Sequence, residues 1–539
     1  MTDRTGPDTG AFLPPSRLPP WGVEDLPEPV PLASRGWGSF VGPGIVMCGI
    51  ALAGGEWLVG ADITARYGGG LMWIATLAIV AQVFYNIECG RYALYCGEPI
   101  FTGFMRLWPG PAPWVGLIFV LSIGAFVPAM STNAAAVAVA AWLGRPPLAA
   151  DAWMVKGVAY VLLALVTLPI LVGGKVYSSL QVIFTVKVVV VLGFCLAMGL
   201  AFVDRAQWWL IYSGFFRFGS VPTTDAAGAE RVVNVFGHWL STGAWPDLRL
   251  ENVALIGAFA GYAGGGGLSN STYSNYVRDK GWGMGSRVGA IPSLVGGRTI
   301  TLSHLGKVFP ATPANLRRWR AWWNYVLADQ LLVWMPGCFM GMALPGLISM
   351  KFSRFSTLYE HKRDLDWAQA LISADGIRRG IADPTLAQVL WLVTLLVGMV
   401  VLVPSQLAVV EEFARKWTDL AWSGLSRIRS GARPGAIRRL YYGILAVYVV
   451  WTTACAWLFN TYGSPKLMAT FIANFNNVAL GLTAFAVLAV NRRFLPPVLR
   501  PGRLATVGMW GCGVFYLGLA ALVFRVTNWP VLHAWWVGR

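Results

Sequence analysis

The residue whose type and position most clearly suggest chemistry is Glu56, which follows the glycine pair Gly54 and Gly55 inside a long apolar stretch. Two adjacent glycines have a large entropic cost in a helix, so we expect a helix to break there. An ionisable group at that depth costs roughly 2.5 kcal/mol or more unless it is paired or faces a wet site. The pattern predicts a carboxylate that ligates a cation or carries a proton. A purely structural role, capping the half-helix that follows, stays open.

A second break is predicted where the apolar residues 251–263 run into four consecutive glycines at 264–267. Interrupted segments at corresponding positions of two halves of a membrane protein indicate a solute site between them. Unwound backbone at this depth is tolerated only where it is buried in protein or lines a cavity. Close helix packing by small residues is the alternative. We expect the site around Glu56 to include residues from both breaks, namely Ala53, Gly54, Trp57, Gly264, Gly265, Leu268 and Asn270.

Charged side chains in other apolar stretches are candidates for gating or coupling. Glu88 precedes Arg91 by three residues, a spacing that favours an interfacial salt bridge, with an inner gate as the alternative. Lys187 lies in the middle of an apolar stretch and must find a partner in the protein interior. Its fixed charge could replace a coupling ion. Asp62 has Arg66 one helical turn later, which favours a solvated pair near the outer surface.

Uncharged and acidic polar residues farther along the chain extend this set. Asp329 could hydrate a pathway, or it could belong to a polar stripe satisfied by neighbouring helices. Gln406 could be a gating amide or a packing amide. Asn474 lies close to Asn476 and Asn477, and we expect at least one of the three to face the cavity.

The elements that must hold these residues are membrane helices. The 539-residue chain is 56% hydrophobic and only 12% charged, whereas soluble domains carry about 25% charged residues. Eleven spans are predicted, at residues 38–63, 70–96, 113–143, 153–173, 177–203, 251–280, 322–349, 386–410, 440–460, 467–490 and 505–525. We expect an all-α integral membrane fold over 38–525, a 5+5 inverted repeat with helices 1 and 6 broken. A disordered cytoplasmic tail is expected at 1–37 and a short tail at 526–539.

The formal net charge of +17 follows membrane topology and does not indicate nucleic acid. Short loops on the side of the N-terminus hold more Lys and Arg, which predicts a cytoplasmic N-terminus and an external C-terminus. The plasma (inner) membrane is the expected location. Basic residues within 278–320 and 415–439 are then cytoplasmic orientation signals that can also contact anionic lipid.

Several classes of protein are disfavoured. All seven cysteines fall in apolar stretches, without a CxxC or HExxH motif, so neither a disulfide framework nor a conventional metal site is expected. Lack of a GxxxxGK[ST] loop disfavours a nucleotide-driven pump. We see no nucleophile or acid–base constellation, so we expect neither an enzyme nor a cofactor.

Four stretches resemble the Nramp family of proton-coupled divalent-metal transporters, which have the leucine-transporter-type fold. They are GPG at 42–44, YGGGLMW at 67–73, the single residue Gln82, and VPSQLAVVEEF at 403–413, in which Gln406 is the matching residue. The resemblance implies that fold, eleven spans and binding at helices 1 and 6.

The chain departs from the family where metal is bound. In place of the family's aspartate, proline, glycine and asparagine it has Ala53, Gly54, Gly55 and Glu56. In place of methionine, proline and histidine it has Leu268, Ser269 and Asn270. The third span, 113–143, has no acidic residue, so the family's proton-route acid is missing.

The oxygen ligands that remain, with Glu56 as the metal ligand, suit Mg²⁺, Mn²⁺ or a monovalent cation better than Fe²⁺ or Zn²⁺. An organic-solute pocket fits equally. We therefore expect a secondary active transporter in the lipid bilayer that moves a metal cation by alternating access, with H⁺ coupling implied by the resemblance. Alternatives are a symporter of a small amine or amino acid, and a non-transporting membrane sensor.

Overall fold

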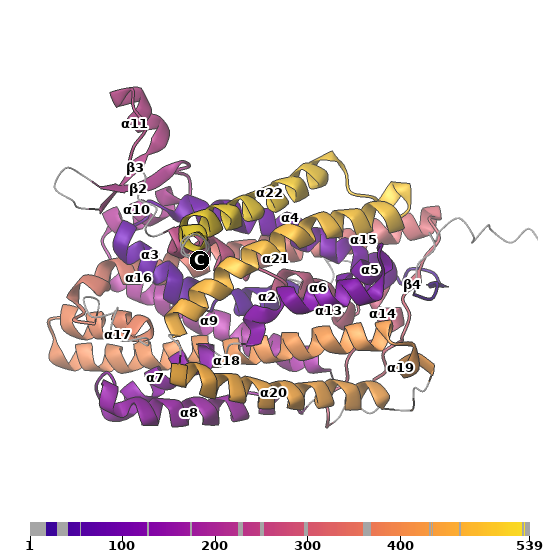
Figure 1. Ribbon diagram of the computed structural model, residues 1–539, viewed down its shortest axis with the longest axis horizontal. Helices are drawn as coiled ribbons and strands as arrows, with labels where there is room; N and C mark the ends of the chain where they lie inside the picture. Colours follow the sequence, from indigo (N-terminus) through magenta and orange to yellow (C-terminus); the bar gives the residue numbers. More distant parts are fainter. Residues whose placement is uncertain are drawn as a thin grey trace, which may run out of the picture.

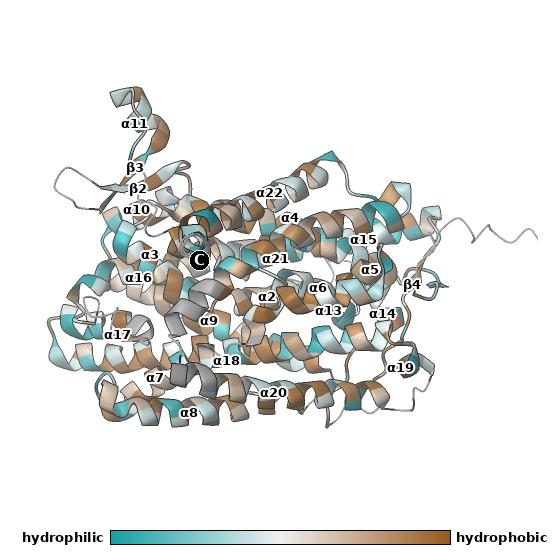
Figure 2. Ribbon diagram, in the orientation of Figure 1, coloured by the Kyte–Doolittle hydropathy of each residue, from teal (hydrophilic) through white to brown (hydrophobic). Residues whose placement is uncertain are grey.

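The computed structural model describes residues 18–29, 41–53, 55–126, 129–172, 175–224, 230–247, 253–295, 300–358, 368–430, 433, 435–462, 465–530 and 533. Most of these residues are helical, and the long helices run roughly parallel to one another (Figure 1). Hydrophobic residues predominate along the middle of these helices, while hydrophilic residues are more frequent at the two ends of the bundle (Figure 2).

The first half of the chain holds the first five predicted spans. Their helices are α2 (Pro43–Ala51), α3 (Gly60–Tyr67), α4 (Met72–Cys96), α5 (Ile100–Arg106), α6 (Pro111–Leu121), α7 (Ala129–Leu143), α8 (Ala152–Leu165) and α9 (Val176–Phe202). A π-helical turn, η3 (Gly55–Val59), joins α3, and short 3₁₀ turns η4 (Ile123–Phe126), η5 (Ala149–Asp151) and η6 (Leu168–Ile170) flank α7, α8 and α9.

The remaining helices are α10 (Arg205–Gly214), α11 (Val235–Thr242), α12 (Val253–Tyr262), α13 (Ser269–Lys280), α14 (Gly285–Val288), α15 (Pro313–Ala328), α16 (Met335–Phe352), α17 (Ala368–Gly380), α18 (Pro384–Gly424), α19 (Ser426–Ser430), α20 (Ala436–Tyr462), α21 (Pro465–Phe494) and α22 (Arg503–Val523). The π-helical segment η8 (Asp329–Trp334) joins α15 to α16, and η11 (Phe524–Asn528) extends α22. The 3₁₀ turn η9 (Ser353–Phe355) follows α16, and η10 (Pro497–Leu499) follows α21.

Among the residues that the structure describes, four short strands lie outside the bundle. Strands β2 (Ser220–Thr224) and β3 (Glu230–Asn234) form an antiparallel hairpin with Ser220 opposite Asn234. Together with α11 this hairpin projects from one end of the bundle (Figure 1). Strand β1 (Gly22–Val23) pairs in parallel with β4 (Lys307–Val308).

Ten helices among the described residues are long and apolar enough to cross a membrane. The predicted sixth span is not one of them, because it is split into the ten-residue apolar α12 and the polar α13. With it, the eleven predicted spans are all accounted for. Large apolar side chains are exposed on the outside of the bundle, as lipid contact requires, for example Val189, Val450 and Val507 at 66%, 71% and 67%. The protein is a mostly α-helical integral membrane protein.

Two predicted boundaries were wrong. The third span is not one continuous helix over 113–143, because α6 ends at Leu121 and η4 follows before α7. The eighth span does not end at residue 410, because α18 continues to Gly424. Glu411, Arg415 and Asp419 in this extension are buried and paired, so the low hydropathy there does not mark the end of the helix.

Part of the segment expected to be a disordered tail is ordered. Within residues 18–29, Trp21 is buried against Tyr92, Tyr95 and Phe494. The Leu26 amide donates to Asn315 Oδ1 over 3.2 Å. An aromatic anchor and strand pairing hold this segment even though its composition is polar and rich in proline.

Candidate functional site

Both predicted helix breaks are present, and they touch. Helix α2 ends at Ala51 and η3 begins at Gly55, while α12 ends at Tyr262 and α13 begins at Ser269. All four glycines at 264–267 have positive φ, from +61° to +112°, which only glycine adopts readily. A Cβ on Gly55 would lie 2.7 Å from Tyr262 Cβ, so the close approach of the two breaks requires a glycine there. Gly54 lies outside the described residues.

Glu56 is buried between the breaks, with only 1% of its surface exposed. Its Oε2 accepts a hydrogen bond from the Ala53 amide over 3.2 Å, which ties the carboxylate to the first break. The Gly264 amide, in the second break, also stabilises the negative charge of this carboxylate. Within the described chain, Oε1 has no hydrogen-bond partner. Glu56 is therefore an acid inside the protein with one oxygen available, as the sequence predicted.

Lys187 is the basic group that acts electrostatically on Glu56. It is completely buried, and its ammonium donates to Ser405 Oγ over 2.7 Å. The sequence predicted that Lys187 needs a partner without identifying one. The structure shows that it joins α9 to α18 beside the first break.

A cavity of about 140 Å³ lies next to the two breaks. Its wall is formed by the end of α2, by η3, and by α7, α13, α18 and α21. Of the predicted site residues, Ala53, Gly265, Leu268 and Gln406 line it. Glu56, Trp57, Gly264 and Asn270 are described but are not among the lining residues. Trp57 instead packs toward Gly398 of α18.

Asn270 faces the scaffold. Its Nδ2 donates to Gln82 Oε1 and to Asn86 Oδ1, each over 2.9 Å. Asn86 in turn donates to Gln330 over 2.9 Å. This chain of amides fastens the second break to α4 and η8, so the Asn270 side chain positions the backbone of the break.

Asp329 also belongs to this polar scaffold. Its Oδ1 accepts from the Gly44 amide over 2.9 Å, at the start of α2, and its Oδ2 accepts from the Tyr273 hydroxyl over 2.9 Å. Of the two interpretations of Asp329, the contacts favour the one in which neighbouring helices satisfy the side chain.

The other candidates for gating occupy packing positions. Glu88 forms the expected ion pair with Arg91, at 2.9 Å, and also accepts from Asn491 over 2.8 Å. Asn474 Nδ2 donates to the Ala254 carbonyl of α12 over 2.9 Å. Asn476 is the asparagine of that group that lines the cavity. The predicted pair of Asp62 and Arg66 is present at 3.2 Å, with the Asp62 side chain buried.

Sequence reasoning missed two charged residues that line the cavity, Glu412 and Lys416. Glu412 accepts from Ser269 Oγ, at the start of α13, over 2.8 Å. The signal was present, because Ser405, Val409, Glu412 and Lys416 recur at helical spacing and share one face of α18. It was overlooked because the predicted span ended before it.

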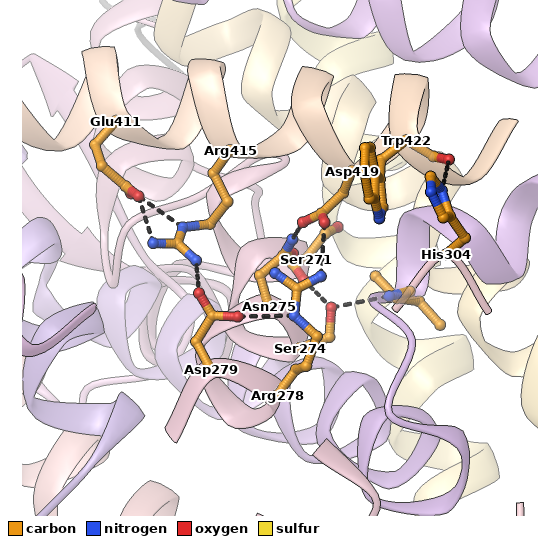
Figure 3. A network of polar contacts seen from close by, with 11 residues as sticks. Ser271, Ser274, Asn275, Arg278, Asp279, His304, Glu411, Arg415, Asp419 and Trp422 are labelled. Carbon is orange, nitrogen blue, oxygen red and sulfur yellow. Dashed lines mark hydrogen bonds and ion pairs between the residues drawn. The ribbon is translucent and has the colours of Figure 1, made fainter. Parts of the chain in front are cut away.

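A fully buried ionic network joins α13 to the same part of α18 (Figure 3). Arg415 binds Glu411 through Nε at 2.7 Å and also pairs with Asp279. Arg278 binds Asp279 at 2.7 Å and Asp419 at 2.6 Å. The expected contact with anionic lipid is therefore wrong for Arg278 and Arg415, because both are buried and paired. Helix α13 does end at Lys280, as predicted.

Among the described residues, no group of three or more His, Cys, Asp and Glu side chains is arranged to hold a metal ion. A cation at the breaks would have to be held by Glu56 and by main-chain and neutral side-chain oxygens.

One solved structure supports the fold. A point mutant of the Eremococcus coleocola manganese transporter matches with a TM-score of 0.57 and 13% identity, over 93% of this chain and 90% of that chain. A second structure, the nucleobase-cation-symport-1 family transporter MHP1 with bromovinylhydantoin bound, matches with a TM-score of 0.48 and 14% identity over 96% of both chains. No protein-family model matches the chain, and neither does any curated protein.

Proposed function

We propose that the protein is a secondary active transporter that moves a small charged solute by alternating access around the two broken helices. The observation that carries the proposal is the meeting of both breaks at the buried Glu56, one of whose oxygens has no partner among the described residues. A buried charge next to unwound backbone is costly unless the site is used. The fold shared with a manganese transporter supports the same assignment.

A metal cation is the first candidate cargo. Glu56 and the unwound backbone offer hard oxygen ligands, which suit Mn²⁺ or Mg²⁺. Lys187 supplies a fixed positive charge beside this site, where a coupling ion would otherwise contribute one. Coupling to H⁺ would then be carried by Glu56, because the third span has no acidic residue.

A small organic solute is the second candidate, favoured by the cavity beside the breaks. The cavity is larger than a bare ion needs, and its wall contains both an acidic and a basic side chain. We place the protein in the plasma (inner) membrane with a cytoplasmic N-terminus.

Flux into proteoliposomes tests the proposal. Purified protein is reconstituted, an inward H⁺ gradient is imposed, and uptake of radiolabelled Mn²⁺, Mg²⁺ analogues and small amino acids is measured. Glu56→Gln should lower uptake at least tenfold, because it removes the charge and keeps the side-chain volume. Asp62→Asn, which alters a carboxylate paired with Arg66 on the same span, is the matched control and should keep most of the uptake. Equal uptake by wild type and Glu56→Gln would remove Glu56 from the mechanism, and no uptake of any probe would refute transport.

A further inference from the structure

We propose that the cavity beside the two breaks binds a small zwitterion, with Glu412 receiving its ammonium group and Lys416 its carboxylate. This inference rests on the proposed function, because it specifies the cargo class. It concerns a different carboxylate from Glu56 and makes its own prediction about equilibrium binding.

The size of the cavity sets the first limit. Its volume of about 140 Å³ is close to that of an engineered protein cavity of about 150 Å³ that binds benzene. The space therefore fits an organic molecule of a few non-hydrogen atoms. The wall also contains apolar side chains, among them Ile50, Leu121, Val409 and Ile472, and these would contact a short carbon skeleton.

The acidic side of the cavity is incompletely satisfied. Glu412 is 8% exposed, and its Oε2 accepts from Ser269 Oγ over 2.8 Å. Its Oε1 is buried and has no partner in the part of the chain that the structure describes. A buried charge without a full set of partners is costly, and a bound ammonium group would supply both the charge and the missing hydrogen bond.

The basic side of the cavity is formed by Lys416. Lys416 is 6% exposed and follows Glu412 by one helical turn, a spacing at which Glu and Lys commonly form an ion pair. Across the described chain no ion pair within 4.0 Å joins these two side chains; the Lys416 ammonium lies 5.8 Å from the centre of the Phe413 ring. The two opposite charges therefore line one cavity and attract each other, but they do not form a close ion pair.

A third polar group, Gln406, lies farther along the cavity wall, ten residues before Lys416 on α18 and so about 15 Å from it along the helix axis. Gln406 lines the same cavity, and its Oε1 is held by the Ser131 amide at 3.2 Å. Its Nε2 is buried and has no partner among the described residues. The Gln406 amide is therefore a separate donor on the cavity wall and does not share a ligand carboxylate with the Lys416 ammonium. A divalent cation would meet only one carboxylate here and would be repelled by Lys416, so the cavity favours a molecule with both charges.

Equilibrium binding to the purified full-length protein in lipid nanodiscs tests this inference. The probes are glycine, L-alanine, β-alanine and γ-aminobutyrate, with propylamine, propionate and Mn²⁺ as probes that carry one kind of charge. At least one zwitterion should bind tenfold or more tightly than both propylamine and propionate. If propylamine or Mn²⁺ binds as tightly as every zwitterion, or if no zwitterion binds, the inference is refuted.

Variants assign the two ends of the ligand. Glu412→Gln should weaken zwitterion binding at least tenfold, because a charge-assisted hydrogen bond is lost. Lys416→Met should weaken zwitterion binding by a similar factor while leaving propylamine binding unchanged. Thr418→Val is the matched control, since Thr418 is buried on the same helix but is not among the lining residues. If Lys416→Met binds the zwitterion as wild type does, Lys416 does not receive the carboxylate.

This test separates the two proposals. Tight zwitterion binding without any flux would support the binding site and refute the transport proposal. Flux of a metal ion alone, with no zwitterion binding, would support transport and refute the zwitterion site. The panel on wild-type protein decides the question even if a variant does not fold.

Discussion

Replacing Arg415 with Met should destabilise the folded protein by about 3–5 kcal/mol, because the change leaves buried carboxylates without their partner. Arg415 is completely buried and binds both Glu411 on its own helix and Asp279 on α13. Asp279 keeps Arg278 as a partner, whereas Glu411 keeps only hydroxyl donors from Tyr276 and Tyr441. Most of the loss should therefore arise at Glu411.

Adding Glu411→Gln to Arg415→Met tests that origin. The second change removes the uncompensated charge and keeps the shape, so the double variant should be more stable than Arg415→Met alone. The control is Arg145→Met, because the Arg145 side chain is 45% exposed and its ion pair with Asp151 lies at the surface. Exposed pairs contribute little, so this variant should unfold at the wild-type midpoint.

The free energy of unfolding can be measured by SDS titration of the detergent-solubilised protein, with the fluorescence of the 27 tryptophans as the signal. A loss for Arg415→Met no larger than that for Arg145→Met would refute the reasoning. The network would then not be what fastens α13 to α18.

Three further predictions follow from single contacts. Gly266→Ala should abolish uptake and lower stability, because Gly266 has φ +73° and a Cβ there would lie 1.8 Å from the Gly261 carbonyl oxygen. The control is Gly443→Ala, since a Cβ on Gly443 meets open space. Normal uptake by Gly266→Ala would show that the break tolerates a side chain. Lys187→Ala should make uptake depend on an added monovalent cation, because it removes the fixed charge beside Glu56. If uptake shows no new ion dependence in a Na⁺ and K⁺ series, Lys187 does not take the place of a coupling ion. Glu98, in the loop after α4, is buried, which raises its pKa, but Arg106 at 2.5 Å more than offsets this and holds the pKa below the ordinary 4.5. The ionised Glu98 carboxylate therefore contributes to stability above pH 4.5, and this contribution is lost as the pH falls through the lowered pKa. The difference in unfolding free energy between wild type and Glu98→Gln should shrink over that pH range. A difference that does not change with pH would contradict this.

The sequence predicted the architecture because membrane helices and their breaks are local features. Eleven apolar segments and two glycine clusters follow from hydropathy and backbone entropy alone, and the structure has both breaks where they were expected. The polar position of Glu56 was equally visible, because a lone carboxylate in an apolar segment stands out.

The direction in which side chains face could not be predicted in the same way. Asn270 and Leu268 are two residues apart, yet Leu268 lines the cavity while Asn270 donates to Gln82 and Asn86 on α4. This depends on the rotation of a half-helix that follows four flexible glycines, and the sequence near the break does not fix that rotation. Glu412 and Lys416 were missed for another reason, because hydropathy treats a charged stretch as the end of a membrane helix. Here α18 continues through that stretch, and α13 provides partners for Glu412, Arg415 and Asp419.

Two faces of one stretch of α18 illustrate what separates structural charges from charges available to a ligand. Glu411, Arg415 and Asp419 recur every four residues. Arg415 and Asp419 pair directly with α13, and Glu411 pairs with Arg415. Glu412 and Lys416 are each one residue further along, so they lie on the adjoining face, where they meet a cavity instead of a helix. Both sets are buried at the same level of the same helix, so burial alone does not distinguish them. The first set has its neutralising partners within the protein. The second set has an acidic and a basic group that form no close ion pair, and Glu412 Oε1 has no hydrogen-bond partner among the described residues. Because an uncompensated charge in the interior is costly, the second set is best explained by a partner that enters the cavity from outside.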